Sequence, residues 1–228
     1  MQRSYLVVGA SKGIGAAVAT HLDAQGAQIL SVSRTPSPIG DWIEADVSTD
    51  AGIDAIAARL GDGPLDGLLY MGGIWEDGAF TDDYDFLSRP RSETRAVIAV
   101  NLTAPILLSQ VLAANLAQAP DPRIVMIGST SGLDRFAPVE VANTASKFGL
   151  RGAAQALATS LRPQKIGVTL INPGNVGTPE VIDDIATGAF GPQDPIQMAD
   201  ILHSIDYVLG CSALTTPEEI NLFQRNPG

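Results

Sequence analysis

The sequence contains almost no cysteine, and this scarcity excludes several kinds of protein. Among 228 residues Cys211 is the single cysteine, so no disulfide can form within the chain. Small secreted domains that depend on disulfides and proteins built around cysteine-rich zinc clusters are therefore excluded. We expect a metal-free fold in a reducing, cytoplasmic compartment.

Basic residues are also scarce relative to acidic ones. Fourteen lysines and arginines stand against 25 aspartates and glutamates, which gives a formal net charge of −11. A phosphate backbone or an anionic membrane surface repels such a chain, so we expect no nucleic-acid or membrane partner. The N-terminus has no secretory cleavage site. The uncharged stretch 96–120 contains several polar residues, and we predict a buried or interface helix there.

Apolar runs are short, and they recur along the whole chain. Each has three or four residues, which is typical of strands buried on both faces of a parallel sheet. The runs lie at 5–8, 29–32, 68–70, 124–127 and 168–171, with shorter candidates at 42–43 and 220–223. The sequence therefore predicts about seven strands.

Alanine-rich segments with helical spacing lie between these runs, at 14–25, 51–60, 94–116 and 141–161. Strand and helix alternating from end to end imply parallel pairing through right-handed crossovers, with helices on both faces. We predict an α/β fold with a doubly wound parallel sheet, in a single domain over residues 1–228. The connection at 172–195 is rich in Pro and Gly and long for such a fold, so we expect a substrate loop near 178–197.

A glycine-rich turn follows the first predicted strand and opens a helix, in the order Gly9-Ala10-Ser11-Lys12-Gly13-Ile14-Gly15. Glycine permits the tight turn and a close approach of the backbone to a pyrophosphate, while the helix N-terminus supplies unpaired N–H groups. At a first strand-to-helix junction, this spacing predicts a dinucleotide site.

The residue at the end of the second strand favours one coenzyme over the other. An NAD site places an acidic residue there to hold the ribose 2′-hydroxyl, whereas this chain has Arg34. A guanidinium suits a 2′-phosphate, and Lys12 in the glycine turn is a second cation for the same group. We predict NADP(H); the alternative is that both are solvated surface charges.

With these and further motifs the chain resembles the short-chain dehydrogenase/reductase family over nearly all of its length, which implies a Rossmann-like sheet. Asp46-Val47 is similar to the pair that contacts adenine. Residues 100–102, 127–129 and 145–147 resemble the segments that carry the family's asparagine, serine and lysine, and 173–178 resembles the turn that closes on the nicotinamide. The implied coenzyme contacts are Gly9, Ser11, Lys12, Gly13, Ile14, Gly15, Arg34, Asp46, Val47, Lys147, Pro173, Gly174, Val176 and Thr178.

The resemblance breaks at the catalytic tyrosine, which the family carries four residues before the lysine. Asn143 occupies that position, and no tyrosine occurs between Asp85 and Asp206, so no shift of the alignment restores it. An amide does not titrate near neutral pH. The implied catalytic residues are Asn101, Ser129, Asn143 and Lys147.

Two functions remain open at this stage. The first is an NADPH-dependent reductase of a ketone or aldehyde on a small or medium organic substrate. In it Lys147 anchors the ribose, Ser129 and Asn143 position the substrate oxygen, and Asn101 holds a water. The proton then comes from water, Ser131, a nearby tyrosine such as Tyr70, or the substrate itself. The second is a non-catalytic NADP(H)-binding sensor or scaffold.

Each candidate residue also has a purely structural interpretation. Ser129 can end a strand, Ser131 can cap a turn, and Asn101 can satisfy a backbone group. Four aromatic residues lie in segments that line substrate pockets in the family, yet each is equally compatible with an ordinary core: Trp75, Phe80, Phe136 and Phe190. Small apolar residues on helices 94–116 and 141–161 favour a homodimer or homotetramer. The resemblance implies a carbonyl or alcohol compound as the small-molecule substrate.

Overall fold

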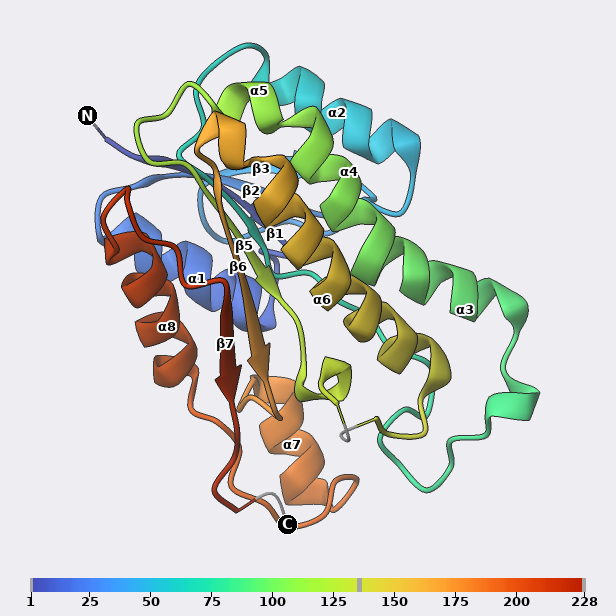
Figure 1. Ribbon diagram of the computed structural model, residues 1–228. Helices are drawn as coiled ribbons and strands as arrows, with labels where there is room; N and C mark the ends of the chain where they lie inside the picture. The colour runs from blue at the N-terminus through green and yellow to red at the C-terminus, as the bar shows by residue number, and fades with distance from the viewer. Residues whose placement is uncertain (1, 135–136, 227–228) are drawn as a thin grey trace.

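The computed structural model describes residues 2–134 and 137–226, and within them one parallel sheet forms the centre of the molecule (Figure 1). The strand order is β3-β2-β1-β4-β5-β6-β7. Their bounds are Ser4–Val8 for β1, Gln28–Ser33 for β2, Asp41–Glu44 for β3, Gly67–Tyr70 for β4, Arg123–Ile127 for β5, Gly167–Pro173 for β6 and Glu219–Leu222 for β7. The predicted doubly wound sheet is confirmed.

Helices cover both faces of the sheet, because successive side chains along each strand point to opposite sides. Leu6 and Val8 belong to the core under α2, α4, α5 and α6, whereas Tyr5 and Val7 belong to the core under α1 and α8 (Figure 1). The helices span Gly13–Ala24 (α1), Asp50–Leu60 (α2), Ala104–Val111 (α4), Ala113–Leu116 (α5), Val141–Ser160 (α6) and Met198–Gly210 (α8). Short 3-10 turns lie at Phe86–Ser88, Thr130–Gly132 and Arg162–Gln164.

The segment predicted as one helix over 94–116 is interrupted. Helix α3 (Arg91–Ile98) passes into a π-helical turn at Ala99–Thr103 before α4 begins. Pro105 has no N–H, so the carbonyl of Asn101 loses the donor that a regular helix would give it. Single π-turns are frequent at functional sites, and this one holds Asn101.

The same stretch accounts for the uncharged region of the sequence. Among the described residues, Arg91–Val111 is long and apolar enough to cross a membrane by length and composition alone, with a mean hydropathy of 1.3. Core helices share these properties. Ala104 and Leu108 are fully buried in the sheet core, but only 33% of the apolar window is buried, which is compatible with the prediction of a buried or interface helix.

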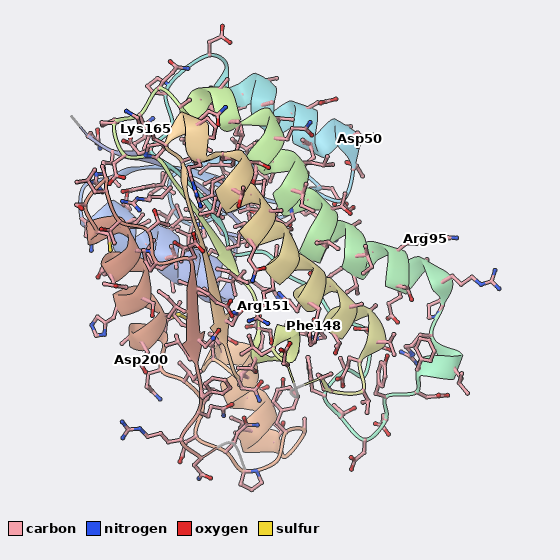
Figure 2. The ribbon with its side chains drawn as sticks, in the orientation of Figure 1. Asp50, Arg95, Phe148, Arg151, Lys165 and Asp200 are labelled. Atoms are coloured by element: carbon pink, nitrogen blue, oxygen red, sulfur yellow. The ribbon has the colours of Figure 1, made fainter. Side chains whose placement is uncertain are left out.

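The segment after β6 is not a continuous loop. Helix α7 (Pro179–Thr187) lies within the expected substrate segment. It begins there because Thr178 caps its N-terminus and Pro179 suits its first turn. The helix buries none of its residues. At the sheet edge, Arg151 of α6, which is labelled in Figure 2, donates to both carboxylate oxygens of Glu219 on β7 at 3.1 Å.

Candidate active site

The site lies at the carboxyl edge of the sheet, where the strand order reverses between β1 and β4. In open α/β sheets this crossover is where ligands bind. The two loops that leave β1 and β4 are in direct contact, since a Cβ on Gly9 would come within 2.8 Å of the Gly72 backbone. Gly9 therefore allows the glycine turn and the loop after β4 to meet.

The glycine turn leaves the start of α1 open to an anion. Gly13 has a φ of +56°, and a Cβ there would meet only the Thr178 side chain, at 3.7 Å. A Cβ on Gly15 would lie 2.2 Å from the carbonyl oxygen of Gly9. Lys12 stands at the N-cap and makes no side-chain capping bond, and no acidic residue lies in the first turn. The backbone donors of this terminus suit a phosphate.

The polar residues around the predicted adenosine end have distinct environments. Arg34 is exposed, and no ion pair of its guanidinium occurs within the described residues. Asp46 accepts hydrogen bonds from the backbone N–H and hydroxyl of Ser48, which lower the pKa of its carboxyl. Val47 packs at the margin of the core. Lys12, the second predicted cation, is paired with Glu180.

Lys147 is the most unusual ionisable group at this edge. It lies on α6 with 9% of its surface exposed, and its ammonium donates to the Ile127 carbonyl at a long 3.3 Å. Burial lowers the pKa of Lys147 to about 8. A Cβ on Gly73 would lie 3.7 Å from the ammonium, so the loop after β4 passes close to it. An ammonium with one long contact retains donors for a ligand's hydroxyl groups.

Asn101 joins three segments of the site and is almost completely buried. Its side-chain oxygen accepts from the N–H of Ile74 at 2.9 Å, and its amide donates to the Ile74 carbonyl at 2.7 Å. The amide also donates to the Ser146 hydroxyl, which in turn donates to the carbonyl of Asn143. Asn101 thereby fixes the loop after β4 to the π-turn and to α6.

Ser129 and Ser131 lie together at the end of β5. The Ser129 hydroxyl donates to the Ser131 hydroxyl at 3.2 Å and accepts from the backbone N–H of Ser131 at 3.1 Å. Ser129 is half-buried and Ser131 is buried. The residue that caps the turn Thr130–Gly132 is Ser129 and not Ser131, which the sequence had offered as a turn cap. A chain of two hydroxyl groups leads from the interior toward Ser129.

Asn143 is buried one helical turn before Lys147, as the sequence spacing predicts. Its side chain makes no hydrogen bond within the part of the chain that the structure describes. Its backbone N–H donates to both carboxylate oxygens of Glu76 at 3.2 Å, and the N–H of Ala142 donates to the same carboxylate at 2.7 Å. Glu76 therefore caps α6 directly behind Asn143.

Sequence patterns did not identify this cap or its neighbours. Glu76 is 2% exposed, and the Tyr84 hydroxyl lies 3.4 Å from it while accepting from the N–H of Val141 at 3.2 Å. A second buried carboxylate, Glu140, accepts from the N–H of Phe80 at 2.7 Å. Apart from the contact between Tyr84 and Glu76, these contacts join residues about 60 positions apart, so no local pattern predicts them.

Replacing Glu76 by glutamine tests the importance of this cap. The substitution keeps the shape but removes the charge of a carboxylate that accepts hydrogen bonds from two backbone N–H groups, and it replaces one acceptor oxygen by an NH₂ donor. We expect the free energy of unfolding to fall by about 1–3 kcal/mol. Urea unfolding of Glu76→Gln beside the exposed control Glu218→Gln measures this; equal stability of the two variants would contradict the capping role.

Tyr70 is the last residue of β4, but its side chain points away from the site and into the core. It is fully buried, its hydroxyl donates to the Val100 carbonyl at 2.5 Å, and burial raises its pKa strongly. The sequence left open whether Tyr70 points toward the site or into the core; it points into the core. Tyr84 is the tyrosine beside the start of α6.

The turn at 173–178 is fixed to the segment that follows α7. Asn175 and Gly177 exchange backbone hydrogen bonds with Ile196 at 2.8 Å, and the Asn175 amide donates to Gln193 at 2.7 Å. Pro173 and Val176 are buried, and Gly174 donates its N–H to the Leu222 carbonyl. The Thr178 hydroxyl caps α7. The turn therefore places Thr178 opposite Gly13 of the glycine turn.

The aromatic residues singled out in the sequence lie in different environments. Trp75 and Phe80 make an edge-to-face pair with centroids 6.1 Å apart, and both are exposed rather than part of the core. Phe190 is half-buried beyond α7. Phe136 lies outside the described residues.

Comparisons with known proteins show which family and which fold this chain is similar to. A family model described as short chain dehydrogenase matches residues 3–186. The short chain dehydrogenase adrF of Penicillium roqueforti is 32% identical over 187 residues, 76% of this chain and 69% of the relative. The short-chain dehydrogenase/reductase olcF of Penicillium canescens is 27% identical over 224 residues, 93% of this chain and 81% of the relative. A metagenomic short-chain oxidoreductase solved in complex with NADP has a TM-score of 0.78 at 25% identity, covering 97% of this chain and 96% of that one.

Proposed function

Because this chain belongs to the short-chain dehydrogenase family, we propose that it is an NADPH-dependent reductase of a ketone or aldehyde on a small or medium-sized organic molecule. The observation that carries the proposal is the buried ammonium of Lys147, which retains free donors at the edge of the sheet where the glycine turn opens. Burying a charge is costly, so an incompletely paired ammonium indicates a group kept for a ligand.

The residues present fit the coenzyme. The open N-terminus of α1, with Gly9, Ser11, Gly13, Ile14 and Gly15, suits its pyrophosphate. Arg34 and Lys12 suit the 2′-phosphate that distinguishes NADPH from NADH, while Asp46 and Val47 lie where adenine is expected. Lys147 suits the ribose hydroxyls beside the nicotinamide, which Pro173, Gly174, Val176 and Thr178 would enclose. When bound, NADPH supplies the hydride that reduces the carbonyl carbon.

The chain's own residues position the substrate and supply the proton. The Ser129 hydroxyl donates a hydrogen bond to the carbonyl oxygen, and the free side-chain amide of Asn143 holds the same oxygen or a water. As negative charge develops on that oxygen, Ser129 transfers its hydroxyl proton to it and receives a replacement proton from Ser131 or from water. In the structure Ser129 donates to Ser131, so re-protonation through Ser131 requires this contact to reverse, with Ser131 donating to Ser129. Asn101 is a positioning residue through its amide, and its carbonyl, which lacks the usual helical donor, accepts from a water.

Replacing each of the two principal donors by alanine tests this assignment. Ser129→Ala and Lys147→Ala are each expected to lower NADPH turnover on a panel of carbonyl compounds by about 10²-fold, the usual effect of removing one positioned donor. Ser204→Ala, on the distant helix α8, is the matched control. Unchanged turnover in both site variants would show that the residues have other roles.

The second candidate function is a non-catalytic NADP(H)-binding sensor or scaffold. It is favoured by Asn143, because a side-chain amide at this position cannot act as an acid near neutral pH. A sensor must bind its partner with different affinities in the oxidised and reduced coenzyme states. A pull-down that recovers the same partner equally with NADP⁺ and NADPH would exclude this candidate.

We place the whole of residues 1–228 in one coenzyme-binding domain, with the segment near 178–197 contacting substrate. A cytoplasmic homodimer or homotetramer fits the chain, because Val111, Val141 and Phe148 leave apolar surface exposed on α4 and α6. Figure 2 shows Phe148 on α6. A monomer at micromolar concentration in light scattering would contradict the oligomer.

A further inference from the structure

Lys12 of the glycine turn and Glu180 of α7 form an ion pair between two segments of the site. The Lys12 ammonium lies 2.9 Å from a carboxylate oxygen of Glu180, and the two side chains are 78% and 48% exposed. The hydrogen bond from Lys12 is the main reason why the pKa of the Glu180 carboxyl is lowered. The pair therefore joins the turn after β1 to a helix that begins almost 170 residues later.

The backbone also brings these two segments together. The Thr178 side chain, which caps α7, is the group that a Cβ on Gly13 would meet, at 3.7 Å. Lys12 precedes Gly13, and Glu180 follows Thr178 by two residues in the first turn of α7. The ion pair thus follows from the packing of the two segments, which places Glu180 beside Lys12.

The two cations expected to hold a 2′-phosphate are in different states. Within the described residues Arg34 makes no ion pair, whereas the charge of Lys12 is already balanced by a carboxylate. One ammonium cannot place its charge fully on both an α7 carboxylate and a phosphate. A carboxylate beside the phosphate-binding cation also repels an approaching anion.

We propose that Glu180 is a coenzyme-selectivity residue, which competes with the 2′-phosphate of NADPH for Lys12. The inference rests on the proposed coenzyme site. It follows that NADPH binding separates Lys12 from Glu180, so α7 loses its ion pair with the glycine turn. NADH lacks the 2′-phosphate and leaves the pair in place. Glu180 therefore narrows the preference of this chain for NADPH over NADH.

The expected effect is moderate because both side chains are solvated. Exposed ion pairs contribute little, and their removal changes an equilibrium constant by roughly two- to fivefold. Glu180→Gln is therefore expected to lower the Kd for NADPH by roughly two- to fivefold, with the Kd for NADH unchanged. The difference is expected to shrink at high salt, which screens surface charges.

The experiment is a fluorescence or calorimetric titration of four proteins with NADPH and with NADH: wild type, Glu180→Gln, Lys12→Met and the double variant. Asp183→Asn is the matched control, since it removes the same charge from an exposed position of α7 that makes no ion pair among the described residues. In the Lys12→Met background, Glu180→Gln is expected to have no larger effect than Asp183→Asn.

The possible failures of this test are distinguishable. If wild type binds neither coenzyme, the proposed function fails and this inference with it. If wild type binds NADPH but Glu180→Gln behaves like Asp183→Asn, the selectivity role alone is wrong. If Glu180→Gln weakens NADPH binding, the ion pair holds the bound coenzyme in place and the competition is contradicted.

Discussion

Replacing Asn143 by tyrosine is expected to raise the turnover of carbonyl compounds with NADPH by about 10²–10⁴-fold, the usual contribution of a general acid. The new phenol would stand on α6 one turn before Lys147, whose ammonium lowers the pKa of a nearby phenol. Position 143 is buried and its present side chain makes no hydrogen bond within the described residues, so no existing polar contact of the side chain is lost.

Asn143→Phe is the matched control, because it introduces the same ring without the hydroxyl. A large side chain in a buried position costs stability by itself, and the phenylalanine variant measures that cost. Steady-state kinetics on both variants, with NADPH affinity as a check of folding, separate the two effects. Equal turnover of the tyrosine and phenylalanine variants would show that position 143 does not face the reacting carbonyl.

Replacing Lys147 by methionine is expected to stabilise the protein without coenzyme while it lowers turnover by about 10²-fold. Burial lowers the pKa of Lys147 from 10.5 to about 8, so the folded state binds the proton less tightly than the unfolded state does. One pKa unit corresponds to about 1.4 kcal/mol, and we expect a gain of about 2–3 kcal/mol at pH 7 after loss of the Ile127 contact. Residues kept for function at the expense of stability are common.

The pH dependence gives this prediction a distinct signature. Below pH 8 lysine is protonated in both states, and the full cost of burying the charge is present. Between pH 8 and 10.5 the unfolded state binds more protons than the folded state, so the stability of the wild type rises with pH. The advantage of Lys147→Met should therefore shrink over this range in urea unfolding. A variant that is less stable than wild type at pH 7 would contradict it.

The sheet and most of its helices could be predicted from the sequence because the signals are local. Short apolar runs mark strands buried on both faces, and even the weak candidates at 42–43 and 220–223 correspond to β3 and β7. The positions of Asn101, Ser129 and Lys147 follow from their place at element ends or in helices that the sequence also identifies. Asn143 stands one turn from Lys147 for the same reason.

The contacts that complete the site could not be predicted because they join distant parts of the chain. Glu76 caps α6 from the loop after β4, and Glu180 pairs with Lys12 across most of the sequence. No local sequence pattern predicts the partner of either carboxylate. Tyr70 was ambiguous for a related reason, since the direction of its side chain depends on Val100 in a π-turn that helical periodicity does not predict.

The most direct test of the central claim is hydride transfer by the wild-type protein. NADPH deuterated at the position that gives up the hydride is incubated with a carbonyl panel, and the products are analysed by mass spectrometry beside those of Asn143→Tyr. The account predicts a product of the wild type with one deuterium on the former carbonyl carbon. NADPH binding without labelled product from the wild type, while Asn143→Tyr labels its products, would contradict a reductase and favour a coenzyme-binding sensor or scaffold.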